Sequence, residues 1–165
     1  MSEVQIAERF GPRVAGIVAD CTDTSGAVAA GGKKEPWLVR KTRYIEHLQS
    51  APLESLLVSA ADKAHNARDM VLDARRDPTM WIKFNAGLEG SAWYLLRLHQ
   101  TFCHRLTDSR SVELLGESVQ EILSSEPYRA CVQGGITPAV WAAGYAERRQ
   151  LAEQEQLRAP HPAGG

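Results

Sequence analysis

Four polar side chains in the stretch from Leu57 to Asp73 are spaced so that they could share one face of a helix. At about 100° per residue, Asn66, Asp69 and Asp73 fall within about 40° of Asp62. Carboxylates one helical turn apart repel each other unless a cation or a polar ligand lies between them. The stripe therefore predicts either the solvated face of an ordinary amphipathic helix or one wall of a binding site.

The opposite face of the same helix is mostly apolar. Only Arg68 interrupts it, and the long stem of an arginine can itself cover apolar surface. Several of the apolar residues are small, so a neighbouring element could approach closely. We expect the buried face to consist of Leu57, Ala60, Ala61, Ala64 and Val71.

Sequence blocks around this helix resemble those of one enzyme family. The block SAADKAHNARD resembles the L-A-D-x-x-H-N-x-R motif of HD-domain metal-dependent phosphohydrolases of the RelA/SpoT-like type, which hydrolyse guanosine polyphosphates. Upstream, ERFGPRVAGIVADCTD and RKTRYIEHL resemble two further blocks of that family, and WIKFNAGLEGSAWYLLRL continues the likeness downstream. The resemblance covers about residues 5 to 107.

The resemblance implies roles for several residues. Asp62 matches the last aspartate of the family's metal site, which typically holds Mn²⁺, and Asn66 matches the amide that contacts the nucleotide, whereas His65 matches a structural residue. Lys83 and Tyr94 lie where related hydrolases place a cation and an aromatic ring beside the nucleotide. Lys41 is a candidate phosphate neighbour for another reason, because an adjacent helix could bring it over the Asp62 stripe. For these three, a surface lysine or a packing aromatic is the alternative interpretation.

The other metal ligands of the family have no counterpart here. The family uses a first His, a His-Asp doublet and a nearby Glu-Asp pair, all expected before ERFGPRV, and the chain contains no His-Asp dipeptide. The catalytic residues are therefore unknown. We expect that the natural protein is longer and that this sequence begins at an internal methionine.

Two functions from different classes follow from this pattern. The first is a metal-dependent phosphohydrolase that acts on guanosine polyphosphates such as ppGpp or on related nucleotides. The second is a catalytically inactive HD module that binds or regulates, whose apolar faces would meet a partner protein or a second copy of the chain. An HD nucleotidase with another nucleotide substrate is a third alternative.

Composition and charge exclude several partners. A net charge of -1 and a pI near 6.5 provide no basic field for nucleic acid or for an anionic membrane. The cysteines, Cys21, Cys103 and Cys131, are widely spaced, which is not the spacing of a zinc site. With no apolar run long enough to cross a bilayer, the sequence predicts a cytoplasmic protein with a nucleotide as substrate and leaves a homo-oligomer open.

The fold expected from the pattern is all-α, an irregular orthogonal bundle like the C-terminal part of an HD domain. Apolar residues recur at helical spacing, as at Val14, Ile17 and Val18, which we expect to be buried, and no alternating strand pattern occurs. We expect a partial HD-like domain at 1–125. The remainder, 126–165, is expected to form one charged helix over about 138–157 and a disordered tail.

Overall fold

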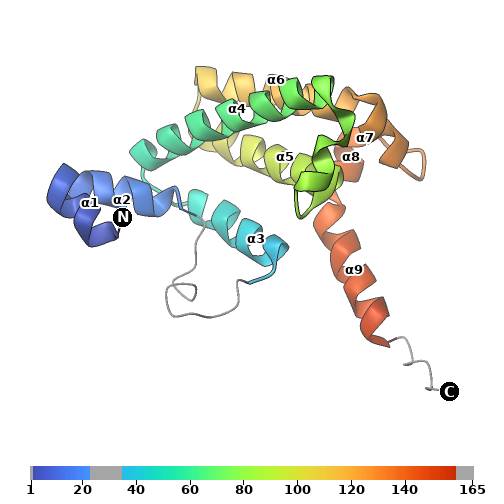
Figure 1. Cartoon of the computed structure of the whole chain (residues 1–165), viewed down its shortest axis with the longest axis horizontal. Coiled ribbons are helices and arrows are strands. Elements are labelled where there is room, and N and C mark those ends of the chain that lie inside the picture. The colour runs from blue at the N-terminus through green and yellow to red at the C-terminus, as the bar shows by residue number, and fades with distance from the viewer. Residues whose placement is uncertain (1, 23–34, 159–165) are drawn as a thin grey trace.

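All regular structure in the described part of the chain is helical, which confirms the all-α prediction (Figure 1). The computed structural model describes residues 2–22 and 35–158, so the tail expected to be disordered lies outside it. The elements are α1 (Glu3–Phe10), α2 (Pro12–Asp20), α3 (Trp37–Leu48), α4 (Leu53–Arg76), the 3-10 helix η2 (Pro78–Lys83), α5 (Gly87–Arg105), α6 (Arg110–Ser124), α7 (Glu126–Cys131), α8 (Pro138–Ala143) and α9 (Tyr145–Arg158).

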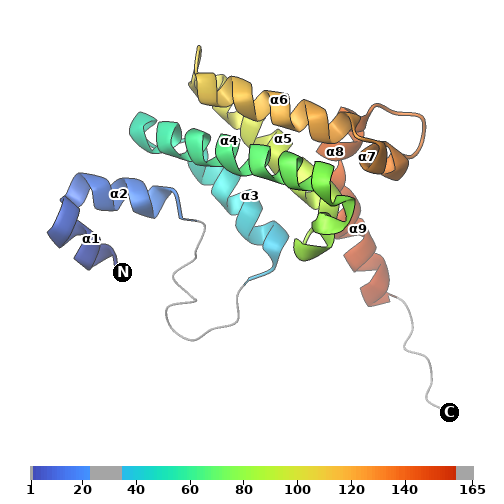
Figure 2. The same cartoon turned by 45° about the horizontal axis from the view of Figure 1, so that its top comes forward.

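The long helices α4, α5 and α6 form the centre of the bundle. In both views α3 and α6 lie on opposite sides of α4 and α5, while α1 and α2 lie beyond the start of α4 (Figures 1 and 2). Large apolar side chains from these helices fill the core, because their removal from water is the main stabilising term. The fully buried ones are Leu48, Leu56, Leu98, Phe102, Leu115 and Tyr128.

The buried face of α4 is rotated from the expected one. Leu57 is 48% exposed and Ala61 is exposed, so the prediction that both are buried is wrong. Two serines are buried instead, because their hydroxyl groups form hydrogen bonds across the helix interface: Ser59 lies 2.7 Å from the Tyr44 hydroxyl, and Ser55 donates to the half-buried Asp20 at 2.6 Å. The buried residues of α4 are Ser55, Leu56, Ser59, Ala60, Ala64, Ala67 and Val71.

Helix α2 buries less than its pattern predicts. Val14 and Val18 are each 40% exposed, and only Ala15 of this helix is buried. The prediction that Val14 and Val18 are buried is therefore wrong. The cause is position: α2 packs chiefly on α1 and on part of α4, so one narrow strip of it is covered.

The C-terminal segment forms three helices where one was expected, because the chain breaks at Gly144 between α8 and α9. The side chain of Glu89 on α5 connects both helices to the bundle. It accepts hydrogen bonds from Trp141 Nε1 at 2.6 Å and from Arg148 Nη2 at 3.2 Å. Tyr128 and Ala142 are fully buried in the main core, so this segment packs against the same bundle.

Two properties of the described residues complete the fold. No helix among them is long and apolar enough to cross a membrane. Cys21, Cys103 and Cys131 are free thiols.

Candidate functional site

One cavity of about 340 Å³ brings together residues from four segments of the chain. We call it the lysine pocket, after Lys41, Lys63 and Lys83. Helix α3 gives two of its residues, α4 gives three, the end of η2 and the turn that follows give four, and α5 gives three. They are Trp37, Lys41, Lys63, Asn66, Met70, Lys83, Phe84, Asn85, Ala86, Ser91, Tyr94 and Leu95.

All four residues predicted to contact a nucleotide line this pocket. Lys41, Asn66, Lys83 and Tyr94 come from three helices and a 3-10 helix, yet they border one cavity. The sequence offered no direct sign of this convergence, because helical periodicity says nothing of which faces meet. The fold therefore supplies a common location for residues that were singled out one by one.

Lys63 is a pocket residue that the sequence analysis missed. It lies inside the SAADKAHNARD block, and its spacing of three from Asn66 puts both side chains on one face of α4. Met70, one turn further along, lines the same cavity. That spacing is the signal that could have found Lys63.

The pocket carries positive charge. No Asp or Glu is among its lining residues, whereas three lysines are. Lys83 is exposed and makes no hydrogen bond or ion pair within the described residues. Because ammonium groups attract phosphate oxygens through charge-assisted hydrogen bonds, such a wall suits a phosphorylated ligand.

Tyr94 positions a lysine in this structure. Its ring is only 8% exposed, and the Nζ atom of Lys41 lies 4.6 Å from the ring centroid. A cation over the face of an aromatic ring is held by the ring quadrupole. The same face is thereby covered, so the half-buried rings of Trp37 and Phe84 are better placed to contact a base.

The segment that carries Lys83 is held in place by a capped turn. The Asp77 carboxylate accepts hydrogen bonds from the Thr79 hydroxyl at 2.6 Å and from the Thr79 backbone N–H at 2.9 Å. These bonds favour the charged form and lower the pKa of Asp77. Asp77 thus fixes the start of η2, whose last residue is Lys83.

Asp62 lies beside the pocket rather than among its lining residues. Its two carboxylate oxygens accept from Lys63 Nζ at 2.5 Å and from Asn66 Nδ2 at 3.1 Å. The side chain is 50% exposed. Asp62 therefore contacts two pocket residues directly and fixes the position of both.

The other carboxylates of the polar stripe also have basic neighbours. Asp69 pairs with His65 at 3.2 Å, and Asp73 lies 3.9 Å from Arg76. Both carboxylates thus have a side chain beside them that can donate a hydrogen bond, and both are well exposed to water, so neither needs a bound cation. At Asp69 and Asp73, the solvated-face interpretation fits the structure.

The described residues do not fit a manganese ion by themselves. No group of three or more His, Cys, Asp or Glu side chains that could hold a metal occurs in the part of the chain that the structure describes. A single exposed carboxylate holds such an ion weakly, because the ion keeps most of its waters. Asp62 as a metal ligand and Mn²⁺ as a cofactor remain predictions from the resemblance.

Comparison with known proteins does not assign the chain to a family. No protein-family model matches the chain, and no curated protein matches it. The functional argument therefore rests on the sequence blocks and on the geometry of the pocket.

Proposed function

We propose that this chain binds a guanosine polyphosphate, or a related phosphorylated nucleoside, in the lysine pocket. The observation that carries the proposal is the convergence of Lys41, Asn66, Lys83 and Tyr94 on one cavity. The resemblance implies that Asn66, Lys83 and Tyr94 lie near one bound nucleotide, and the cavity is a space that all four residues border.

The chemistry of the pocket divides into two parts. Lys41 and Lys83 are placed to contact phosphate groups, whereas Lys63 forms an ion pair with Asp62 at the edge of the pocket. The amides of Asn66 and Asn85 can both donate and accept, as the edge of a base or a ribose hydroxyl requires. A cavity of about 340 Å³ is within the usual range for small-molecule sites.

We propose further that the bound nucleotide is the substrate of an HD-type phosphohydrolase. In such an enzyme the metal polarises a phosphate oxygen and activates water. Within this chain, Asp62 is the one proposed ligand, so the remaining ligands must come from outside the described residues. The part of this chain would then be to hold the nucleotide and to position its phosphates.

A binding module without catalysis is the second candidate. Exposed apolar side chains on the outer face of α4 favour it, because such a patch suits a partner protein or a second copy of the chain. Leu53, Leu57 and Val58 are 55%, 48% and 49% exposed. This candidate uses the same pocket but predicts binding with no turnover.

Titration calorimetry with ppGpp, followed by an assay for released pyrophosphate with Mn²⁺, tests both candidates. We expect binding by the wild-type chain and loss of about tenfold in affinity for Asn66→Ala, which removes a hydrogen-bonding amide. Arg129→Gln, a charge change on an exposed residue of α7, is the matched control and should bind normally.

Turnover distinguishes the two candidates. Release of pyrophosphate that Asp62→Ala abolishes supports the hydrolase, and binding without release supports the module. Failure of the wild-type chain to bind ppGpp, or equal affinity of Asn66→Ala and wild type, would contradict the assignment of the pocket.

A further inference from the structure

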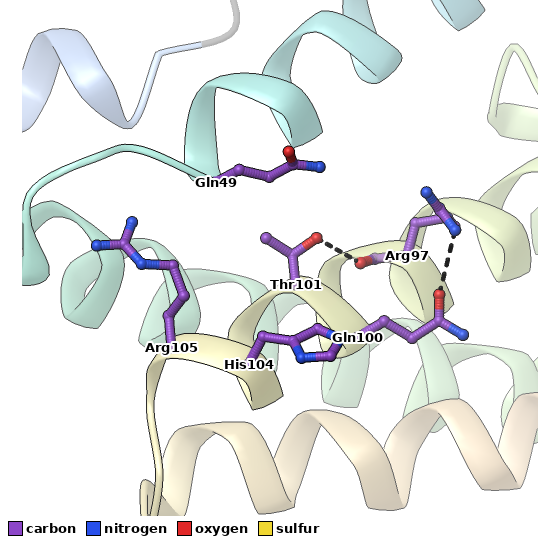
Figure 3. Close-up of a pocket in the computed structure, with 6 residues that line it drawn as sticks. All are labelled: Gln49, Arg97, Gln100, Thr101, His104 and Arg105. Carbon is purple, nitrogen blue, oxygen red and sulfur yellow. Dashed lines mark hydrogen bonds between the residues drawn. The ribbon is translucent and has the colours of Figure 1, made fainter.

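A second cavity, of about 460 Å³, lies between the end of α3 and the C-terminal half of α5. We call it the arginine pocket. Figure 3 shows Arg97 and Arg105 on either side of Thr101. Its lining residues are Gln49, Arg97, Gln100, Thr101, His104 and Arg105.

The two guanidinium groups of this pocket have no carboxylate partner within the described residues. Arg97 donates only to the Gln100 side-chain oxygen, at a long 3.4 Å. Arg105 donates from Nη1 to the carbonyl oxygens of Leu48 and Ala51, at 3.2 and 2.7 Å. Within the described residues, the N–H groups of its Nε and Nη2 atoms have no hydrogen-bond acceptor. Two positively charged groups thus border one hollow, and the oxygens that accept their hydrogen bonds are uncharged.

Elsewhere in the described chain, many arginines are neutralised. Seven of them lie 2.5–3.9 Å from an Asp or Glu oxygen: Arg13, Arg43, Arg75, Arg76, Arg110, Arg148 and Arg149. These seven arginines thus have a carboxylate neighbour. The arginine pocket contains two guanidinium groups and no Asp or Glu, so a negative charge is the missing partner.

We infer that the arginine pocket binds a small, multiply charged phosphate anion. The planar guanidinium fork matches the oxygens of a phosphate, and Gln49 and His104 add neutral or basic donors around it. The positions of Arg97 and Arg105, two turns apart on α5, suit an anion with more than one charged group, such as a pyrophosphate. A hollow of this size favours a small molecule over a protein surface.

The lining of the arginine pocket is poorly suited to bind a nucleobase. No Trp, Tyr or Phe lines it, whereas base recognition commonly uses an aromatic face. The ligand is therefore identified by its phosphate groups rather than by a base. This inference concerns residues outside the lysine pocket and does not depend on the function proposed for it.

Inorganic pyrophosphate is the probe, titrated into the full chain by calorimetry at constant ionic strength. We expect one bound pyrophosphate, with affinity reduced about tenfold in Arg97→Gln because a charge-assisted hydrogen bond is lost. Arg97→Lys should recover only part of the affinity, since it keeps the charge without the fork. Arg129→Gln, which removes a similar charge from α7, should bind like wild type.

Arg105 is left unchanged because its bonds to Leu48 and Ala51 hold the end of α3. Circular dichroism of each variant checks that the fold is kept. Lys83→Gln separates the two cavities: pyrophosphate affinity lowered by Lys83→Gln and not by Arg97→Gln would overturn the inference. Equal affinities of Arg97→Gln and Arg129→Gln, or no binding by the wild-type chain, would overturn it too.

Discussion

The lysine pocket and the arginine pocket lie along the same pair of helices but differ in their walls. Trp37 and Lys41, near the start of α3, face the first half of α5, while Gln49, just past its end, faces the second half. The first pocket combines three lysines with aromatic rings and side-chain amides. The second has arginines and neutral polar groups with no Trp, Tyr or Phe.

This difference shows that the positive charge of a pocket does not by itself determine which ligand it binds. Both cavities attract anions, but only the lysine pocket adds flat apolar surface that a base could contact. We therefore expect a phosphorylated nucleoside in one and a phosphate anion without a base in the other. Variants that change one pocket and leave the other intact test this difference in ligand.

The largest effect is expected from the double substitution Lys41→Gln and Lys83→Gln. Loss of two charge-assisted contacts to phosphate should weaken ppGpp binding by about a hundredfold. Pyrophosphate binding in the arginine pocket should change by less than about twofold. Calorimetry with both ligands on one preparation measures this, and a parallel loss of both affinities would show that the cavities act as one site.

Removal of an aromatic wall should have a smaller effect, and on one ligand only. Phe84→Ala should weaken ppGpp binding about tenfold, because contact with a base through an aromatic face contributes about 1–3 kcal/mol. Pyrophosphate affinity should stay unchanged. Ile82→Ala is the matched control, because Ile82 lies in the same segment and is 85% exposed. Equal effects of the two substitutions would remove Phe84 from the site.

The two pockets were not equally predictable from sequence. Asn66, Lys41, Lys83 and Tyr94 belong to blocks with a family resemblance, so four residues of the lysine pocket could be singled out before their meeting place was known. Arg97 lies at the edge of one such block and was not singled out. The arginine pocket depends on the fit of Gln49 against α5, and helical periodicity does not reveal such a contact.

The same limit applies to the fold. Helix α1 ends before Gly11, and α2 and η2 begin at Pro12 and Pro78, where these residue types favour a helix boundary. The helical class followed from apolar spacing. The rotation of α4 did not follow, because Ser59 is buried only where the Tyr44 hydroxyl meets it. The burial of a polar residue is therefore predicted wrongly when its hydrogen-bond partner lies on another helix and only its own helix is considered.

The bond between Tyr44 and Ser59 supports both pockets, because it joins α3 to α4 in the core at 2.7 Å. We expect Ser59→Ala to lower the free energy of unfolding by about 1 kcal/mol, since it removes the hydrogen bond between two buried hydroxyl groups. Urea denaturation measures this. Tyr44→Phe combined with Ser59→Ala should cost less than the sum of the two single variants. Strict additivity would show that the bond contributes nothing to the position of α3.

The smallest expected effect concerns His99, on the face of α5 opposite the arginine pocket. Burial lowers the pKa of His99, and a Cβ atom added to Gly116 would lie 2.6 Å from its Nε2 atom, which shows how closely α6 approaches. Because the unfolded chain takes up a proton near the ordinary histidine pKa of about 6.5 and the folded chain resists it, the contribution of His99 to stability is present above that pH. It is lost progressively as the pH falls from about 6.5 through the lowered pKa of the folded state.

Thermal unfolding measured between pH 7.5 and 5 should therefore show a smaller decline in stability for His99→Gln than for wild type. His104→Gln is the control, because His104 is an exposed histidine on the same helix. Identical pH profiles for wild type and His99→Gln would mean that α6 does not bury this ring.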